Sequence, residues 1–238
     1  MSLYRDRGVV LRTIRLGEAD RIVTFLTSEH GKVRAVAKGI RRTKSRFGAR
    51  LEPLGNVALL LYQGRELDVV TQAETIERFP RLREDLELMA RATSMLEAVD
   101  HIAQERQSSP ALYTMLVGAL RALSAGGSSL VAPAFFLKLL ALEGLEPVLD
   151  RCALCEGAGE LVAFDFDSGG TLCQGCRRGL AVSPGALELM RRILGGELAR
   201  VLAEPVGAAG TEVEHLAARA MEHHLERRLR SFGVLDRA

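Results

Sequence analysis

The hydrophobic pattern of the chain changes its period at Phe79-Pro80, and this change constrains the fold more than any other feature. Before it, apolar residues alternate with polar ones over short, β-branched runs that end at glycine-containing turns. After it, apolar residues recur every three or four positions, as on the buried face of a helix. The sequence therefore predicts a multi-domain α+β protein, with a β-domain over residues 1–79 and a helical domain over residues 80–238.

The β-domain carries five strand-like segments, each bounded by turn residues. They cover residues 7–16, 20–27, 32–38, 51–62 and 67–76. Five short strands in about 70 residues are typical of a small closed barrel, and an OB-fold is the architecture that we predict. An SH3-like barrel satisfies the same strand count.

The second part has the pattern of an α-helical bundle. Helices are predicted over residues 82–102, 111–123, 133–142, 184–194 and 211–232. Ser183 suits the N-cap of the fourth helix and Pro184 its first turn. Thr211 is predicted to cap the fifth helix, and Glu214 would complete a capping box with it.

All four cysteines fall in one stretch between the third and fourth predicted helices. Cys152 and Cys155 form one C-x₂-C pair, and Cys173 and Cys176 form a second pair after seventeen intervening residues. This is the spacing of a four-cysteine zinc site, in which each pair presents two thiolates to one ion. Two disulfides or a redox pair are alternatives. A cytosolic setting disfavours disulfides, and a redox site needs only one C-x₂-C motif, whereas this chain has two. We predict a zinc ribbon, inserted at residues 150–180, that holds one structural Zn²⁺.

The stretch from residue 32 to residue 50 contains eight lysines and arginines and no acidic residue. The whole chain carries only +2, and residues 1–80 hold 15 basic and 9 acidic side chains. A solubilising surface normally mixes both signs, so this segment favours nucleic-acid binding through phosphates. The predicted contact residues are Lys32, Arg34, Lys38, Arg41, Arg42, Lys44, Arg46, Arg50 and Phe47. The ring of Phe47 either stacks on a base or packs as a lid onto the barrel.

Strand alternation places Lys32, Arg34 and Lys38 on one side of their strand, opposite Val33 and Ala35. Phosphate contacts carry no base information, so we expect binding that is nearly independent of sequence. The chain has no Trp and only 5% aromatic residues. Nucleic-acid contacts should therefore depend on charge more than on stacking.

Several classes of protein are disfavoured by what the sequence lacks. No apolar run approaches the ~20 residues of a membrane span, and the first residues have no signal-peptide pattern, so we expect a cytoplasmic protein without a membrane partner. There is no P-loop and no H-E-x-x-H motif. Glu18 and Asp20 border a turn, where structural use is commoner than metal binding. We predict no enzymatic activity.

Short segments along the chain form a recognisable set. They are Tyr4-Arg5-Asp6, GEADRIV at residues 17–23, His30-Gly31-Lys32, AKGIRR at residues 37–42, Leu51-Glu52-Pro53-Leu54 and the four-cysteine block. In this order they resemble RecO, a bacterial family of recombination mediators and DNA repair proteins. The resemblance implies a non-enzymatic, nucleoid-associated protein that binds single- and double-stranded DNA and anneals complementary strands.

The resemblance also implies protein partners. With RecR, such a protein helps to load RecA onto strands coated by single-strand-binding protein (SSB), whose acidic C-terminal tail docks on the helical domain. Two alternatives stay open from the residues alone. One is a zinc-stabilised OB-fold protein that binds RNA or ribosomes, because a barrel and a basic loop serve RNA equally well. The other is an unrecognised nucleic-acid-processing enzyme whose catalytic residues are scattered along the chain.

Overall fold

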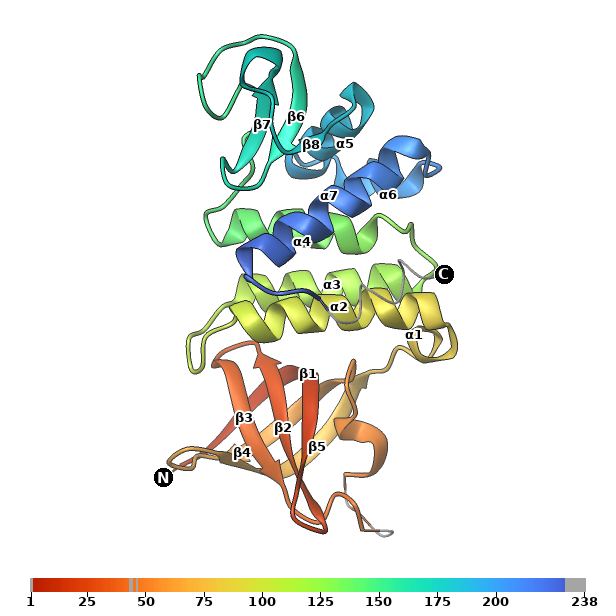
Figure 1. The fold of residues 1–238 in the computed structure, drawn as a ribbon. Coiled ribbons are helices and arrows are strands. Elements are labelled where there is room, and N and C mark those ends of the chain that lie inside the picture. Colours follow the sequence, from red (N-terminus) through yellow and green to blue (C-terminus); the bar gives the residue numbers. More distant parts are fainter. Residues whose placement is uncertain (1, 43–44, 46, 230–238) are drawn as a thin grey trace. The chain divides into compact units, whose positions relative to one another are not determined.

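A computed structural model of the chain describes residues 2–42, 45 and 47–229 (Figure 1). The chain divides into two compact units, residues 1–124 and 125–238. Among the described residues, the first unit holds a β-barrel and three α-helices, and the second holds four α-helices and a small sheet. The predicted α+β architecture, a barrel followed by helices with a four-cysteine insertion, is confirmed. No helix in the described part of the chain is long and apolar enough to cross a membrane.

The barrel is closed and has five strands. They are β1 (Leu3–Leu16), β2 (Asp20–Thr27), β3 (Gly31–Ala37), β4 (Asn56–Tyr62) and β5 (Asp68–Glu77). β1 pairs with both β2 and β4, and β3 pairs in parallel with β5, so the order around the barrel is β1-β2-β3-β5-β4. This is an OB-like arrangement. Its core is filled by alternate residues of each strand, among them Phe25, Val33 and Leu61.

Two strands, β1 and β4, begin several residues away from their predicted starts, and the other boundaries agree to within one residue. β1 begins at Leu3 rather than at residue 7, because residues 3–9 pair with β4. Within this stretch the carboxylate of Asp6 is buried and accepts the N–H groups of Arg7 and Glu29. Because a buried polar residue interrupts the alternation of apolar and polar residues, the hydrophobic pattern does not predict this part of the strand. β4 begins at Asn56 because the preceding residues form a short 3-10 helix, η1 (Gly48–Leu51), and a turn.

The first unit continues into α1 (Arg81–Glu84), α2 (Leu86–Ile102) and α3 (Pro110–Ser124). The single long helix predicted here is interrupted at Asp85. Its backbone is extended and its side chain accepts the N–H of Leu88 at 3.0 Å, so it is an N-cap. α2 and α3 lie side by side over one end of the barrel (Figure 1).

The loop between α2 and α3 pairs with the edge of β3. The N–H of Lys32 donates to the carbonyl of Gln104 at 3.3 Å, and the N–H of Arg106 donates to the carbonyl of Lys32 at 3.0 Å. Gly31 has a φ of 64°, and a Cβ there would lie 1.8 Å from the carbonyl oxygen of Gln107. Only glycine allows the two segments to approach this closely.

Two buried carboxylates brace this junction. Asp68 accepts hydrogen bonds from the hydroxyl of Tyr4 and, at 2.6 Å, from the guanidinium of Arg106. Asp6 lies 2.6 Å from Nδ1 of His30, whose ring packs against that of Tyr4. Burial and the neighbouring Asp68 raise the pKa of Tyr4 well above its usual range, so its hydroxyl remains a hydrogen-bond donor.

The second unit places a small zinc-ribbon-like sheet among four helices. Its elements are α4 (Val131–Leu142), β6 (Leu161–Asp165), β7 (Gly170–Cys173), the 3-10 helix η2 (Gln174–Cys176), β8 (Leu180–Ala181), α5 (Pro184–Leu194), α6 (Leu198–Ala203) and α7 (Ala208–His224). The sheet order is β7-β6-β8. α4 is buried along nearly its whole length and packs against α5 and α7.

The caps of α5 and α7 are linked. Ser183 caps α5 as predicted, since its hydroxyl accepts the N–H of Ala186 at 3.1 Å. α7 begins after Gly207, three residues before Thr211, so the predicted capping box is wrong. Instead, the carboxylate of Glu212 in the first turns of α7 accepts the N–H and hydroxyl of Ser183 at 2.7 and 2.6 Å.

Candidate nucleic-acid interface and metal centre

The loop that follows β3 folds back onto the turn between β1 and β2. Oδ1 of Asp20 accepts the N–H of Gly39 at 2.7 Å, and the N–H of Arg41 donates to the carbonyl of Ala19 at 3.0 Å. Gly39 has a φ of 67°, which lets the chain reverse at this point. Asp20 therefore has the structural role in a turn that its position in the sequence favours.

These contacts present three exposed cations, Lys38, Arg41 and Arg42, at the end of the barrel that carries the β1–β2 turn. We call these three residues the basic turn. The guanidinium of Arg41 donates to the backbone carbonyl of Glu18 at 2.8 Å, which leaves its charge unneutralised. Within the described part of the chain, none of the three forms an ion pair with a carboxylate. Their positive charge is available to an external anion.

Lys32 and Arg34 lie on the outer side of β3, as alternation predicts, but both have partners in the same unit. Nζ of Lys32 donates to the carbonyl of Asp100 near the end of α2, at 2.7 Å. The guanidinium of Arg34 lies 3.6 Å from the carboxylate of Glu105. The carboxylate of Glu105 partly neutralises Arg34, whereas Lys32 keeps its charge but is only partly exposed. Both are therefore less available to phosphates than the exposed cations of the basic turn.

Of the remaining predicted contact residues, the structure describes Phe47 and Arg50, at the start and in the body of η1. Phe47 is only 2% exposed and belongs to the barrel core. Its ring packs onto the barrel, which is one of the two predicted alternatives, and a buried ring is not available to stack on a base. Arg50 is exposed in η1. Lys44 and Arg46 lie outside the described residues.

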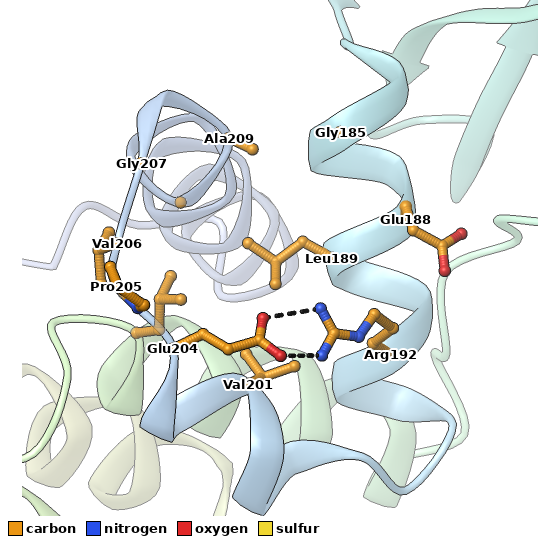
Figure 2. A pocket seen from close by; sticks show the side chains of 12 residues that line it. Gly185, Glu188, Leu189, Arg192, Val201, Glu204, Pro205, Val206, Gly207 and Ala209 are labelled. Carbon is orange, nitrogen blue, oxygen red and sulfur yellow. Dashed lines mark hydrogen bonds and ion pairs between the residues drawn. The ribbon is translucent and has the colours of Figure 1, made fainter.

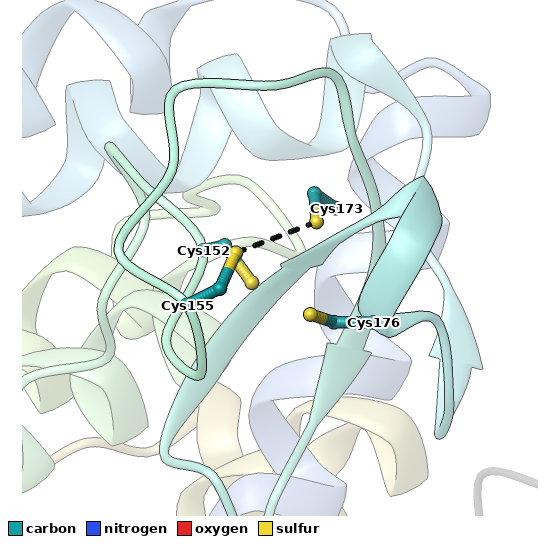
Figure 3. Close-up of side chains that lie close together, drawn as sticks. All are labelled: Cys152, Cys155, Cys173 and Cys176. Carbon is teal, nitrogen blue, oxygen red and sulfur yellow. Dashed lines mark hydrogen bonds between the residues drawn. The ribbon is translucent and has the colours of Figure 1, made fainter.

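The four cysteine side chains converge on one point in the second unit (Figure 3). Their sulfur atoms all lie within 4.8 Å of one another, and Sγ of Cys155 is 3.8 Å from Sγ of Cys173. A zinc ion held by four thiolates at about 2.3 Å requires sulfur atoms about 3.8 Å apart, the edge of a tetrahedron. The cluster therefore fits a metal ion and could form a zinc site.

Each cysteine pair is positioned by a tight local turn. The N–H of Cys152 donates to the carbonyl of Gly157 at 3.1 Å, and its carbonyl accepts the N–H of Glu156 at 2.9 Å. The second pair lies where β7 ends, at Cys173, and η2 follows, ending at Cys176. Both turns bring their thiols to the same point, which is the ligand arrangement of a zinc ribbon.

Two family models match this chain. The model described as Recombination protein O N terminal matches residues 1–79, and the one described as Recombination protein O C terminal matches residues 83–232. The chain belongs to the RecO family. It is therefore a recombination mediator of DNA repair, a class of DNA-binding proteins with partners in the recombination machinery and no known enzymatic activity. The resemblance seen in the sequence is confirmed.

In this RecO family member the thiols differ in acidity when no metal is bound. Hydrogen bonds from the backbone N–H groups of Cys155 and Cys173 lower the pKa of Cys152 to about 6. Hydrogen bonds to the other thiols, Cys155 first, raise the pKa of Cys176 to about 12. A metal ion would bind all four as thiolates, so its binding would release protons.

Arginines next to the cysteines have structural partners. Arg178 donates to the carboxylate of Asp165 at 3.0 Å and to the hydroxyl of Ser168 at 2.8 Å, which closes the turn between β6 and β7. Burial alone would raise the pKa of Asp165, but hydrogen bonds from Ser168 and Arg178 outweigh it and lower that pKa. Arg151 lies 3.2 Å from the carboxylate of Asp150. Both arginines therefore have carboxylate partners within the second unit.

The second unit also contains a pocket of about 250 Å³ between α5, α6 and the start of α7 (Figure 2). Leu189, Val201 and Val206 give it apolar walls. The guanidinium of Arg192 forms two hydrogen bonds with the carboxylate of Glu204, at 2.9 and 2.5 Å. This ion pair neutralises the one cation that lines the pocket, so little charge remains there to select an anionic ligand.

Proposed function

We propose that this chain binds single- and double-stranded DNA through the basic turn and anneals complementary strands. With RecR, it would help to load RecA onto single strands coated by SSB. Membership of the RecO family supports the mediator role, and the basic turn supports the contact with DNA. The SSB tail, RecR and RecA are the partners that the family resemblance implies, at work on DNA in the cytoplasm.

The observation that carries the proposal is the exposure of Lys38, Arg41 and Arg42 at one end of the barrel, without carboxylate partners among the described residues. Three cations on a short, braced loop can neutralise neighbouring phosphates without reading bases. Complementary strands repel each other through their backbones. A surface that neutralises both backbones lowers this repulsion and so favours pairing.

We further propose that the chain acts by binding rather than by chemistry, and that its metal is one structural Zn²⁺. Among the described residues, the four cysteines are the one cluster of His, Cys, Asp or Glu close enough to hold a metal. Four thiolate ligands fill a tetrahedral ion and leave no position for water or substrate. Such a site stabilises the hairpin and the chain around it.

Strand annealing tests the proposal. Complementary DNA oligonucleotides, bare or coated with SSB, should anneal faster with the wild-type chain, and R41E/R42E should lose most of this acceleration. The control R78E/R81E makes the same change in net charge at exposed residues, one of them in α1 at the other end of the barrel (Figure 1). No acceleration on either substrate would contradict the proposal. Stronger binding to RNA than to DNA, or cleavage with Mg²⁺ or Mn²⁺, would favour the alternatives.

A further inference from the structure

The four cysteines of the metal centre differ in how far solvent reaches them. Cys152 is 0% exposed, Cys173 and Cys176 are half-buried, and Cys155 is exposed. The neighbouring Leu154 is 49% exposed, so the turn that carries Cys155 projects into solvent. Oxidation of thiolates follows their exposure, and buried structural cysteines are inert. Cys155 is therefore the ligand that an oxidant reaches first.

Cys155 also lies beside a second thiol that is placed to react with it. Its Sγ is 3.8 Å from Sγ of Cys173, which belongs to the other pair (Figure 3). A disulfide has an S–S length of about 2.05 Å, so the two sulfur atoms would have to approach by about 1.8 Å. Cys173 ends β7, whereas Cys155 lies in a surface turn, so the turn is the part that would move. An accessible thiolate with a resolving cysteine next to it is typical of redox-sensitive sites.

The ribbon around these cysteines has a very small hydrophobic core. Among the described residues, the cluster at the metal centre contains three buried side chains, Cys152, Ala163 and Leu172. The two strands of the hairpin, β6 and β7, have five and four residues. Modules with so little core are usually held together by a metal or by disulfides. Loss of the metal would therefore open the ribbon.

Opening the ribbon would disturb the neighbouring helices of the second unit, because it contacts α5 and α7. The guanidinium of Arg191 in α5 donates two hydrogen bonds to the carbonyl of Leu149, at 2.9 and 2.5 Å. In α7, the ring of His223 packs against that of Phe166, with the ring centroids 5.9 Å apart. Leu149 comes just before the first cysteine pair, and Phe166 comes directly after β6. The state of the cysteines is thus linked to helix packing in this unit.

We propose that Cys155 is a peroxide-sensitive modification site, and that its oxidation to a disulfide with Cys173 opens the ribbon. Two of the four metal ligands are lost in this disulfide, so the site can no longer hold the ion. The inference rests on the structural Zn²⁺ proposed above and is independent of the proposed DNA contacts. The oxidant is hydrogen peroxide, and a dithiol reductant reverses the change.

The chemistry takes two steps. The thiolate sulfur of Cys155 attacks one oxygen of hydrogen peroxide, the O–O bond breaks, and hydroxide leaves, which converts the thiolate to a sulfenic acid. The thiolate of Cys173 then attacks the sulfenic sulfur, an S–S bond forms, and the S–O bond breaks, with the departing oxygen taking up a proton to leave as water. The two cysteines lose two electrons in total, and these reduce the peroxide to hydroxide and water.

The test follows metal release from the zinc-loaded full-length chain with a colorimetric chelator while hydrogen peroxide is added. Mass spectrometry after alkylation of the free thiols identifies the oxidised cysteines. The first disulfide should join Cys155 to Cys173, and zinc should be released together with it. Hydrogen exchange should increase in the ribbon and stay unchanged in the barrel. A dithiol reductant with added zinc should restore the site.

Two variants separate the exposed thiol from the others. C155H keeps four ligands, since three cysteines and one histidine also bind zinc, but it removes the exposed thiolate. It should release zinc at least about fivefold more slowly than the wild type, because exposure decides which thiolate is oxidised. The control C176H makes the same replacement and leaves Cys155 and Cys173 in place, so it should remain as sensitive as the wild type. If either variant fails to bind zinc, the disulfide found in the wild type decides.

First oxidation at Cys152 or Cys176 overturns the inference, and so do equal rates of release from C155H and the wild type. If peroxide leaves zinc bound to the wild type, the inference is rejected and the structural site stands. If the wild type contains no zinc, both the inference and the proposed metal fail, while the proposed DNA binding is unaffected.

Discussion

Replacing Arg41 and Arg42 by glutamine should flatten the salt dependence of DNA binding by a calculable amount. Each phosphate that a cation neutralises on a single strand contributes about −0.7 to the slope of log K against log salt. Both side chains are exposed, and the Arg41 guanidinium donates to a carbonyl rather than to a carboxylate, so both charges are available. Losing them should raise the slope by about 1.4, whatever other contacts remain.

The size of the wild-type slope shows how many cations take part. The three residues of the basic turn alone predict about −2.1, and all eight cations of residues 32–50 predict about −5.6. Because Arg34 is paired with the carboxylate of Glu105 and Lys32 is only partly exposed, we expect a value nearer the first. Between 50 and 200 mM salt, wild-type affinity should then fall about sevenfold more than that of the variant.

Anisotropy titrations of a labelled single strand at several NaCl concentrations measure both slopes. The control R78Q/R81Q removes the same charge from residues outside the basic turn, and its slope should equal that of the wild type. A slope that R41Q/R42Q leaves unchanged would show that phosphates bind elsewhere. A loss of affinity for one DNA sequence only would contradict recognition through the backbone.

Three further changes test the architecture. C152S/C155S should abolish bound zinc in elemental analysis and lower the melting temperature, because a structural site contributes on the order of 10 kcal/mol to local folding. A wild-type protein that contains no zinc and has the same melting curve as the variant would refute this. Burial alone would raise the pKa of Asp165, but hydrogen bonds from Ser168 and Arg178 outweigh it and lower that pKa in the folded chain. The ionised carboxylate therefore stabilises the fold above pH ~4, and this contribution is lost as the pH falls through the lowered pKa. D165N should therefore cost about 1–3 kcal/mol at pH 7 in urea unfolding, with a gap to wild type that closes in acid and not in base. F47A removes a core ring and should cost about 3–5 kcal/mol; a change below about 1 kcal/mol would mean that the ring is not needed in the barrel.

Local pattern predicted most of the fold, because strands and longer helices bury one face and their periods are visible in the sequence. The hydrophobic pattern gave wrong boundaries where a polar side chain caps a helix or is buried within a strand. Asp85 interrupts a helix whose apolar spacing continues past it, and Asp6 lies buried within a strand. The six residues of α6 are too few to show a period. The cysteine cluster was predictable because its spacing alone determines which thiols can meet.

The DNA-binding site was predictable only in part. The positive charge along residues 32–50 indicated which segment contacts DNA, but it did not show which of its cations remain available to phosphates. The partners of Lys32 and Arg34, Asp100 and Glu105, lie about 70 residues away, and nothing local identifies them. Phe47 had two reasonable positions in the sequence, and burial decided between them.

The pairing between β3 and the loop after α2 makes residue 79 a poor place to cut the polypeptide. A fragment ending there would lose the backbone partners of Lys32 and the guanidinium that accompanies the buried Asp68. The exposed edge of β3 in such a fragment could pair with other molecules and so promote aggregation. The N-terminal family model thus ends at residue 79, inside the compact unit of residues 1–124. A recombinant barrel should be expressed through residue 124.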